Sequence, residues 1–171
     1  MNQQGNRSAW KGLVAGVIGG VVASWAMDRF QYWWLSFDGS DERELQQTPS
    51  DHQEEPATVK TASAISEGVF GHELTAKEKE ITGSMVHYAV GTTAGAVYGV
   101  AAEHEPNVTT LAGLPFGAAF WLVVDEGALP LLRLAKGPAA YPLSTHAYAL
   151  ASHLVFGLTA EVVRSTVRRA L

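Results

Sequence analysis

The sequence contains no cysteine and relatively few charged residues. Without cysteine the chain has no disulfide, no thiolate nucleophile and no thiolate ligand for a metal. Charged residues make up 17% of its 171 residues, whereas roughly 25% is usual in soluble domains. The basic residues form no patch that would suit nucleic acid. The composition therefore excludes thiol chemistry, disfavours nucleic-acid binding and favours a lipid environment.

The charges that are present are unevenly distributed. Residues 38–80 hold 11 acidic and 4 basic residues, a net charge of −7, and the rest of the chain carries +2. The mean hydropathy, which is close to zero, therefore averages an acidic segment with strongly apolar ones. Without the acidic segment, the composition is that of a membrane protein.

Four apolar segments are each long enough to cross a bilayer. Trp10 and Trp33 bound the first and lie about 35 Å apart along a helix, which suits a hydrocarbon core of roughly 30 Å. A cleaved signal peptide is the competing interpretation, but this apolar stretch is too long and no small-residue cleavage site precedes its aromatic cluster. We predict a single all-α membrane domain, a bundle of four transmembrane helices with spans at residues 10–34, 81–102, 109–130 and 142–163.

Basic residues near the chain ends predict the orientation of the bundle. Four spans place both termini on one side, where five basic residues gather: Arg7, Lys11, Arg164, Arg168 and Arg169. The positive-inside rule makes that side cytoplasmic. Four basic residues flank spans on the opposite side and count against this orientation: Lys77, Lys79, Arg133 and Lys136.

Residues 36–74 form a long loop between the first two spans, and this loop is external in the predicted topology. Its acidic part, residues 38–56, is expected to be mobile. Apolar residues then recur at helical spacing from Val59 to Phe70, which predicts a short amphipathic helix on the bilayer or over the bundle. Thr75 and Glu78 fit a capping box, so the second transmembrane helix is expected to begin before residue 81.

Small residues recur four apart along the spans. This spacing lets helix backbones approach closely, and close packing holds helices together in lipid, where no hydrophobic force acts between them. The residues predicted to pack helices are Gly12, Gly16 and Gly20 in the first span, Gly91, Gly95 and Gly99 in the second, Gly113 and Gly117 in the third, and Gly157 in the fourth.

Two pairs of segments resemble each other. Residues 97–103 read VYGVAAE and residues 155–161 read VFGLTAE, while the first and third spans open with GLVAG and GLPFG. A duplicated helical hairpin with parallel halves would produce this pattern. Chance matches among small apolar residues would produce it equally well.

Ionisable residues within the spans lie at a common depth. Four of them fall about 10 Å from the midplane, toward the external side: Asp28, His87, Asp125 and His146. Glu126 follows Asp125 in this layer, and His153 shares a helix face with His146. Because an ionisable group in a span is energetically costly, each of these side chains is expected to have a specific partner.

The ionisable layer has several interpretations. The structural one is a set of hydrogen-bonded pairs, Asp28 with His87 and Asp125 with His146, that fix the register of the helices. The whole layer, Glu126 included, would also bind a divalent metal or carry protons, because imidazole and carboxylate ligate metals and histidine titrates near neutrality. Haem between His87 and a histidine of the fourth span, at position 146 or 153, is a further alternative. No spacing matches a known ligand motif, so no cofactor and no catalytic residue is predicted.

Two glutamates mark the cytoplasmic ends of the second and fourth spans. Glu103 is expected in an exposed turn before Pro106, and Glu161 is expected to reach the interface toward Arg164. Together with His153, they are the remaining polar residues predicted within or at the ends of the spans.

Several short motifs resemble those of a known family. They are Trp10-Lys-Gly-Leu-Val-Ala-Gly16, His87 with Gly91 and Tyr98-Gly99, Gly113 with Gly117, and Ser152-His153-Leu-Val-Phe-Gly157 with Glu161. In these motifs the chain resembles the YagU-like bacterial inner-membrane family, small multi-span proteins of unassigned function. The resemblance covers the spans rather than residues 38–80. It implies a bacterial inner membrane and cytoplasmic basic ends, and it implies no catalytic residue.

Two functions are compatible with the sequence. Because the chain has no nucleotide loop, no nucleophile with a base and no metal motif, we predict a non-enzymatic accessory or assembly subunit of a larger membrane complex or homo-oligomer. Its partners would be the lipid bilayer and either other membrane subunits or further copies of itself. The alternative is a proton- or metal-handling membrane protein that uses the intramembrane His and carboxylate layer.

Overall fold

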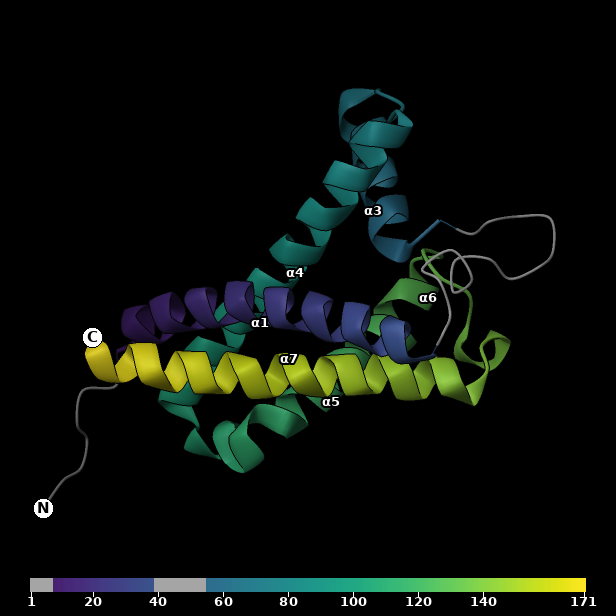
Figure 1. Ribbon diagram of the computed structural model, residues 1–171. Coiled ribbons are helices and arrows are strands. Elements are labelled where there is room, and N and C mark those ends of the chain that lie inside the picture. The colour runs from purple at the N-terminus through teal and green to yellow at the C-terminus, as the bar shows by residue number, and fades with distance from the viewer. Residues whose placement is uncertain (1–7, 39–54) are drawn as a thin grey trace, which may run out of the picture.

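The computed structural model describes residues 8–38 and 55–171. No strand occurs in this part of the chain, so the predicted all-α class is confirmed there. The predicted mobile part of the loop, residues 38–56, lies mostly outside the described residues, as does Arg7. The α-helices are α1 (Ala9–Asp38), α3 (Ala57–Ile65), α4 (Ala76–His104), α5 (Leu114–Val123), α6 (Leu129–Leu131) and α7 (Leu143–Ala170), as Figure 1 shows.

Two helical runs are long and apolar enough to cross a membrane, Ala9–Ser36 and Asn107–Leu131. Along the first of these, in α1, small residues are buried and large apolar residues are exposed. Ser24 is fully buried, for example, whereas Ile18 is 40% exposed and Trp25 is 56% exposed. This distribution is the reverse of that in a helix on the surface of a soluble protein.

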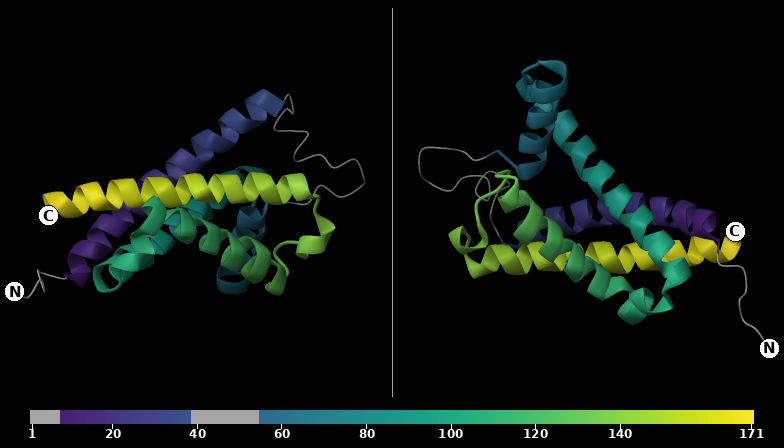
Figure 2. Two further views of the ribbon diagram at one scale, coloured as in Figure 1. Left: turned by 90° about the horizontal axis from the view of Figure 1, so that it is seen from below. Right: turned by 180° about the vertical axis from the view of Figure 1, so that it is seen from behind.

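The long helix α1 lies antiparallel to both α4 and α7. The start of α1 therefore meets the end of α7, where Lys11 Nζ donates a hydrogen bond of 2.7 Å to the backbone oxygen of Leu171. Figure 1 shows these two helix ends side by side, and Figure 2 shows α1 and α7 crossing when the molecule is seen from below. An even number of long helices traversing the bundle would bring the ends together in this way.

The third predicted span is not one continuous helix. Pro106–Gly113 is wound as a tighter 3₁₀-type helix, and Leu111 and Ala112 within it have left-handed φ angles of 50° and 54°. α5 begins only after these residues, with Pro115 in its first turn. Proline lacks a backbone N–H and clashes with the carbonyl four residues earlier, so a straight helix through this point is disfavoured. The helix expected over residues 109–130 is therefore interrupted at Leu111 and Ala112, within the apolar run Asn107–Leu131.

α3 and the first turns of α4 project away from the other helices (Figures 1 and 2). The short helix predicted from Val59 to Phe70 is present as α3, which begins at Ala57 and continues into a wider π-helical turn at Ser66–Phe70. α3 packs back along α4, where Val59 lies against Gly83. We refer to residues 57–70 and 76–86 together as the arm.

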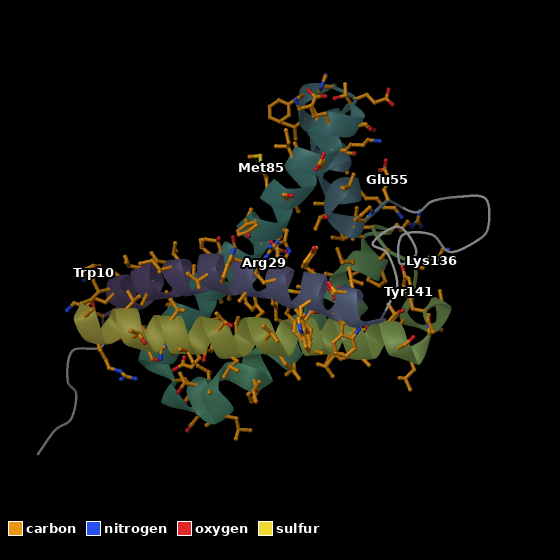
Figure 3. The ribbon with its side chains drawn as sticks, in the orientation of Figure 1. Trp10, Arg29, Glu55, Met85, Lys136 and Tyr141 are labelled. Atoms are coloured by element: carbon orange, nitrogen blue, oxygen red, sulfur yellow. The ribbon has the colours of Figure 1, made fainter. Side chains whose placement is uncertain are left out.

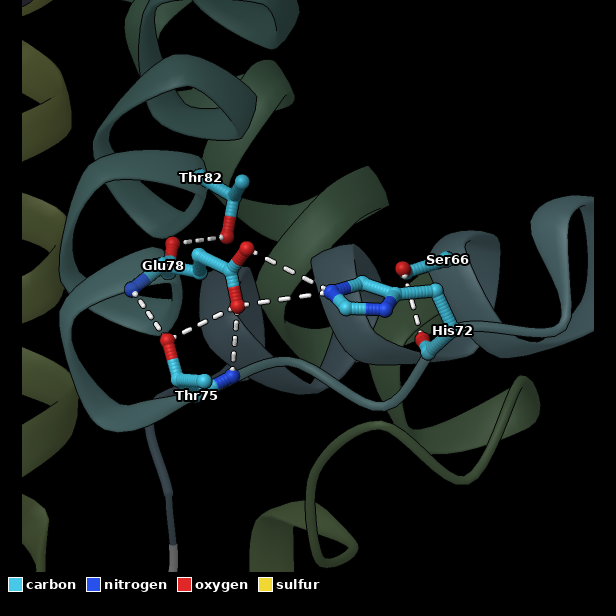
Figure 4. A network of polar contacts seen from close by, with 5 residues as sticks. All are labelled: Ser66, His72, Thr75, Glu78 and Thr82. Atoms are coloured by element: carbon cyan, nitrogen blue, oxygen red, sulfur yellow. Dashed lines mark hydrogen bonds and ion pairs between the residues drawn. The ribbon is translucent and has the colours of Figure 1, made fainter.

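The beginning of α4 is capped by its own side chains (Figure 4). Thr75 Oγ1 accepts a hydrogen bond from the Glu78 backbone N–H, and the Glu78 carboxylate accepts one of 2.8 Å from the Thr75 backbone N–H. His72 Nε2 lies 3.3 Å from the same carboxylate. The hydrogen bonds from Thr75, and next that from His72, lower the pKa of Glu78. The predicted capping box and early helix start are confirmed.

Candidate functional site

Glycines bring the backbones of α1 and α4 into direct contact. A Cβ added at Gly95 would lie 2.5 Å from the Gly16 carbonyl oxygen and 2.6 Å from the Gly20 Cα. Gly99 lies against the carbonyl oxygen of Gly12 in the same way. These separations are too short for any side chain, so the crossing of the two helices depends on glycine at these positions.

α5 and α7 are in contact through a second glycine seam. Gly157 lies against the carbonyl oxygen of Gly113, and Gly117 lies against the backbone of α7. The two seams use corresponding positions of the similar sequence segments, Gly12 with Gly99 in one and Gly113 with Gly157 in the other. Each pair of antiparallel helices is thereby fixed in register, and this register positions the ionisable side chains.

The first seam places Asp28 of α1 beside His87 of α4. His87 Nε2 lies 3.1 Å from Asp28 Oδ1, and the predicted pairing of these two residues is confirmed. The Tyr88 hydroxyl also donates a hydrogen bond of 2.9 Å to Asp28 Oδ2. Tyr88 is a member of this cluster that sequence spacing does not reveal, because consecutive residues of a helix point about 100° apart.

The predicted pairing of Asp125 with His146 is wrong. His146 Nδ1 lies 2.6 Å from Glu126 Oε1, and His146 Nε2 lies 3.0 Å from the backbone oxygen of Pro138. Asp125 faces His153 instead, with 3.7 Å between its Oδ2 and the histidine Nδ1. The candidate residues of the third and fourth spans therefore form two separate pairs.

Helix geometry explains why the partners differ from the prediction. Side chains lean toward the N-terminus of their own helix, and the segment of Asp125 runs antiparallel to α7. Asp125 and His153 therefore lean toward each other and meet despite an offset along the helix axes. Glu126, the next residue, points about 100° away and meets His146. Both acidic residues lie in a wider π-helical turn at Val124–Ala128, which was not predicted from the sequence.

A cavity of about 500 Å³ lies between α1, α3, α4, α7 and the segment from α5 to α6. Most of the lining is apolar, but His87, Asp125 and His153 border the cavity, so members of two His–carboxylate pairs face one space. Ser24 borders it as well. This serine is fully buried, and its hydroxyl has no hydrogen-bond partner among the described residues. The cavity therefore combines an apolar wall with a few converging polar groups, which is typical of small-molecule sites.

Ion pairs close the opposite end of the bundle. Arg168 Nε donates to the Glu103 carboxylate over 2.5 Å, and Arg164 donates two hydrogen bonds of 2.7 and 2.8 Å to Glu161. The hydroxyl of Tyr98, a residue only 2% exposed, donates a third hydrogen bond of 2.8 Å to Glu161. The predicted contact of Glu161 with Arg164 is confirmed.

Glu103 does not lie in the exposed turn that was expected, since the residue is only 8% exposed. The reason is that α7 continues to Ala170, past the predicted end of the fourth span at residue 163, and this extension carries Arg168 to Glu103. The backbone N–H of Ser8 donates a further hydrogen bond of 3.1 Å to Glu103. Glu103 thus links both ends of the described chain to α4.

The candidate metal ligands are not gathered into one site. Within residues 8–38 and 55–171, no group of three or more His, Cys, Asp or Glu side chains is placed to hold a metal ion. The five candidates belong instead to separate His–carboxylate pairs: Asp28, His87, Asp125, Glu126 and His146. Protein zinc sites use three or four protein ligands, whereas a single His–carboxylate pair is sufficient to bind a proton.

Over residues 8–38 and 55–171 the fold is that of an all-helical protein with two helical runs that are long and apolar enough to cross a membrane. Residues 47–162 match the family model described as "Protein of unknown function (DUF1440)", and the chain belongs to this family. The match begins after α1, and its description makes no reference to YagU. No curated protein and no solved structure matches the chain.

Proposed function

We propose that this protein is a four-span protein of the bacterial inner membrane, related to the YagU-like proteins, with both chain ends in the cytoplasm. The exposed apolar side chains of α1 support a lipid environment, and the contact between Lys11 and Leu171 supports an even number of spans. The basic end of α7 lies at the same end of the bundle, which favours a cytoplasmic position for that end. The two glycine seams favour a bundle of two similar hairpins.

Single cysteines will test this topology, because the native chain has none. Gly68 has open space where a side chain would be and belongs to the proposed external loop, whereas Asn107 lies in the proposed cytoplasmic turn. A membrane-impermeant maleimide added to intact spheroplasts should label Gly68→Cys and leave Asn107→Cys unlabelled until the membrane is opened. Equal labelling of both variants in intact spheroplasts would overturn the four-span arrangement.

The function that the geometry supports best is proton handling at the external end of the bundle. The supporting observation is that three His–carboxylate pairs, drawn from α1, α4, α7 and the turn after α5, lie toward one end. One pair would be enough to fix helix register, and each further ionisable pair within a membrane adds a cost in insertion free energy. Histidine is the side chain whose charge changes near neutral pH.

The closed opposite end gives this function a direction. The Glu103–Arg168 and Glu161–Arg164 pairs separate the layer from the proposed cytoplasmic side. Protons from outside would therefore reach the His–carboxylate layer first, and passage to the cytoplasm would require these ion pairs to open. The protein would act as a gated proton pathway with its gate at the cytoplasmic end.

Proteoliposomes that contain a pH-sensitive dye will test this function. With potassium and valinomycin setting the membrane potential, wild-type protein should acidify the vesicle interior faster than protein-free vesicles do. His87→Gln and Asp28→Asn should abolish the difference, because they remove the pair at the start of the pathway. His72→Gln is the matched control, since His72 is exposed and lies outside the bundle.

Two outcomes would contradict proton handling. The first is acidification that equals that of protein-free vesicles both with wild-type protein and with Arg168→Met, a variant that lacks part of the cytoplasmic gate. The second is a flux that His87→Gln leaves unchanged. Circular dichroism of each variant will establish that the helices remain folded.

A second candidate function is assembly with another membrane subunit or a further copy of the chain. The observation that favours it is the projecting arm, where Phe70, Ile81 and Met85 are 75%, 52% and 64% exposed. Figure 3 shows Met85 pointing into open space beside the arm. An apolar surface that leaves the bundle is available to a neighbouring protein as well as to lipid.

Oxidative crosslinking in native membranes will show whether a second copy of the chain covers the arm. Met85→Cys should form a disulfide-linked dimer if a second copy covers the arm, whereas Val97→Cys, on an exposed face of α4 outside the arm, should not. Crosslinking at neither position, together with a monomeric mass in mild detergent, would exclude self-assembly through the arm.

A further inference from the structure

Two polar side chains that border the cavity, Ser24 and Asp125, have incomplete hydrogen bonding. The Ser24 hydroxyl is buried without a partner among the described residues. Asp125 lies 3.7 Å from His153 Nδ1, which is beyond hydrogen-bond distance. The same Nδ1 lies 2.9 Å from the backbone oxygen of Ala149, and this carbonyl takes its hydrogen. In the described part of the chain, the Asp125 carboxylate therefore accepts no hydrogen bond from a side chain or from the backbone.

The rest of the cavity is suited to an apolar body. Its wall includes Phe120 and Phe156, whose ring centroids lie 5.2 Å apart, together with aliphatic side chains such as Met27, Val90 and Leu129. Aromatic ring faces attract cations as well as apolar groups. The volume of about 500 Å³ falls within the range of roughly 300–1,000 Å³ that is usual for small-molecule sites.

We propose that this cavity binds a lipophilic ammonium ion, a compact apolar molecule that carries one protonated amine. The amine would donate a hydrogen bond to the Asp125 carboxylate, and the two phenylalanine rings would contact the cation and its apolar body. An anionic ligand would be repelled by Asp125. A neutral ligand would bring no positive charge to this carboxylate, which accepts no hydrogen bond from the neighbouring His153.

This inference goes beyond proton handling and is tested independently of it. At pH 8 an aliphatic amine is already protonated in solution, so its binding requires no proton transfer by the protein. Loss of proton flux with retention of ammonium binding would reject the proposed function alone. Retention of flux with absence of binding would reject the ligand proposal alone.

Three probes with one apolar cage and different charges will test the proposal: 1-adamantylammonium, 1-adamantanol and 1-adamantanecarboxylate. Binding to the full-length protein in lipid nanodiscs is measured by isothermal titration calorimetry at pH 8, and protein-free nanodiscs supply the correction for partitioning into lipid. The ammonium probe should bind at least about tenfold more tightly than the alcohol. The carboxylate probe should show no binding above that of protein-free nanodiscs.

Two neighbouring carboxylates provide a matched pair of variants. Asp125→Asn should reduce ammonium affinity by about tenfold or more and remove the preference over the alcohol. Glu126→Gln should preserve both, because Glu126 is paired with His146 and neither residue is among those that line the cavity in the described chain.

Equal binding of the ammonium and alcohol probes to wild-type protein would overturn the proposal. So would an unchanged ammonium preference in Asp125→Asn, or an equal loss in Glu126→Gln. If Asp125→Asn does not remain folded by circular dichroism and gel filtration, Phe120→Leu decides the matter. This variant keeps the cavity apolar but removes one aromatic face, so it should weaken the ammonium probe and leave the alcohol probe within about twofold.

Discussion

Gly157 of α7 lies directly against the carbonyl oxygen of Gly113. The same relationship joins Gly99 of α4 to Gly12 of α1, so two antiparallel helix pairs are held by glycines at corresponding positions of similar segments. Where backbones are in contact, even one methyl group has no space. The helix crossings, and with them the placement of the His–carboxylate pairs, therefore depend on single glycines.

Gly95→Ala is expected to destabilise the protein, and Gly95→Leu is expected to destabilise it more. Alanine favours a helix by about 1 kcal/mol over glycine, but overpacking typically costs about 1–3 kcal/mol and here meets backbone rather than movable side chains. Thermal unfolding in detergent will show the order of stability.

Two variants are the controls, and neither should change the unfolding temperature much. Val97→Leu lies on an exposed face, and the Cβ added by Gly127→Ala would lie 3.4 Å from the Leu122 carbonyl oxygen, an ordinary contact. Equal tolerance at positions 95 and 97 would contradict the glycine seam.

Double-mutant cycles will distinguish the observed carboxylate partners from those predicted by depth alone. Glu126→Gln and His146→Gln should be coupled by about 0.5–3 kcal/mol in unfolding free energy, as expected for contacting residues. Asp125→Asn and His146→Gln should be additive within about 0.5 kcal/mol. Coupling between Asp125 and His146, with additivity between Glu126 and His146, would instead support the pairing predicted from the sequence. Guanidinium unfolding in mild detergent, monitored by circular dichroism, supplies the free energies.

Arg168→Met is expected to destabilise the protein more than the double variant Glu103→Gln with Arg168→Met. The single change leaves the buried Glu103 carboxylate without its cationic partner, and breaking a buried pair costs up to about 3 kcal/mol when some solvent remains. The double variant removes the charge as well. Arg169→Met is the matched control at an exposed position and should have little effect. A double variant that is no more stable than the single one would count against a buried ion pair at this end.

Acid is expected to loosen the first turn of α4. The hydrogen bonds from Thr75 hold the pKa of Glu78 below its ordinary value of 4.5. Their stabilising contribution is therefore fully present above pH 4.5 and is lost as the pH falls through the lower folded-state pKa. Hydrogen exchange of the amides of residues 76–80, corrected for intrinsic rates, should accelerate below that point. Glu78→Gln should show no such pH dependence, and an equal acceleration in this variant would exclude the capping carboxylate as its cause.

The sequence by itself determined the features that follow from local chemistry and helical periodicity. The capping box of Thr75 and Glu78 depends on residues three apart, and α3 follows from apolar spacing within one short segment. The pairing of Asp28 with His87 was also predictable, because each is the prominent ionisable residue at the same depth of its own span. The family match names no function, and the sequence motifs supply none.

Only the tertiary structure decided the features that depend on helix register and direction. Asp125 and Glu126 are adjacent in sequence, and which of them meets His146 depends on a wider turn and on the lean of side chains from antiparallel helices. Glu103 and Arg168 lie 65 residues apart, and they meet because α7 extends beyond the apolar span. The cavity beside Ser24 exists because five segments converge there without filling the space between them. Residue identity and spacing specify helices and their faces, but the offset between packed helices follows from close contacts that no single segment contains.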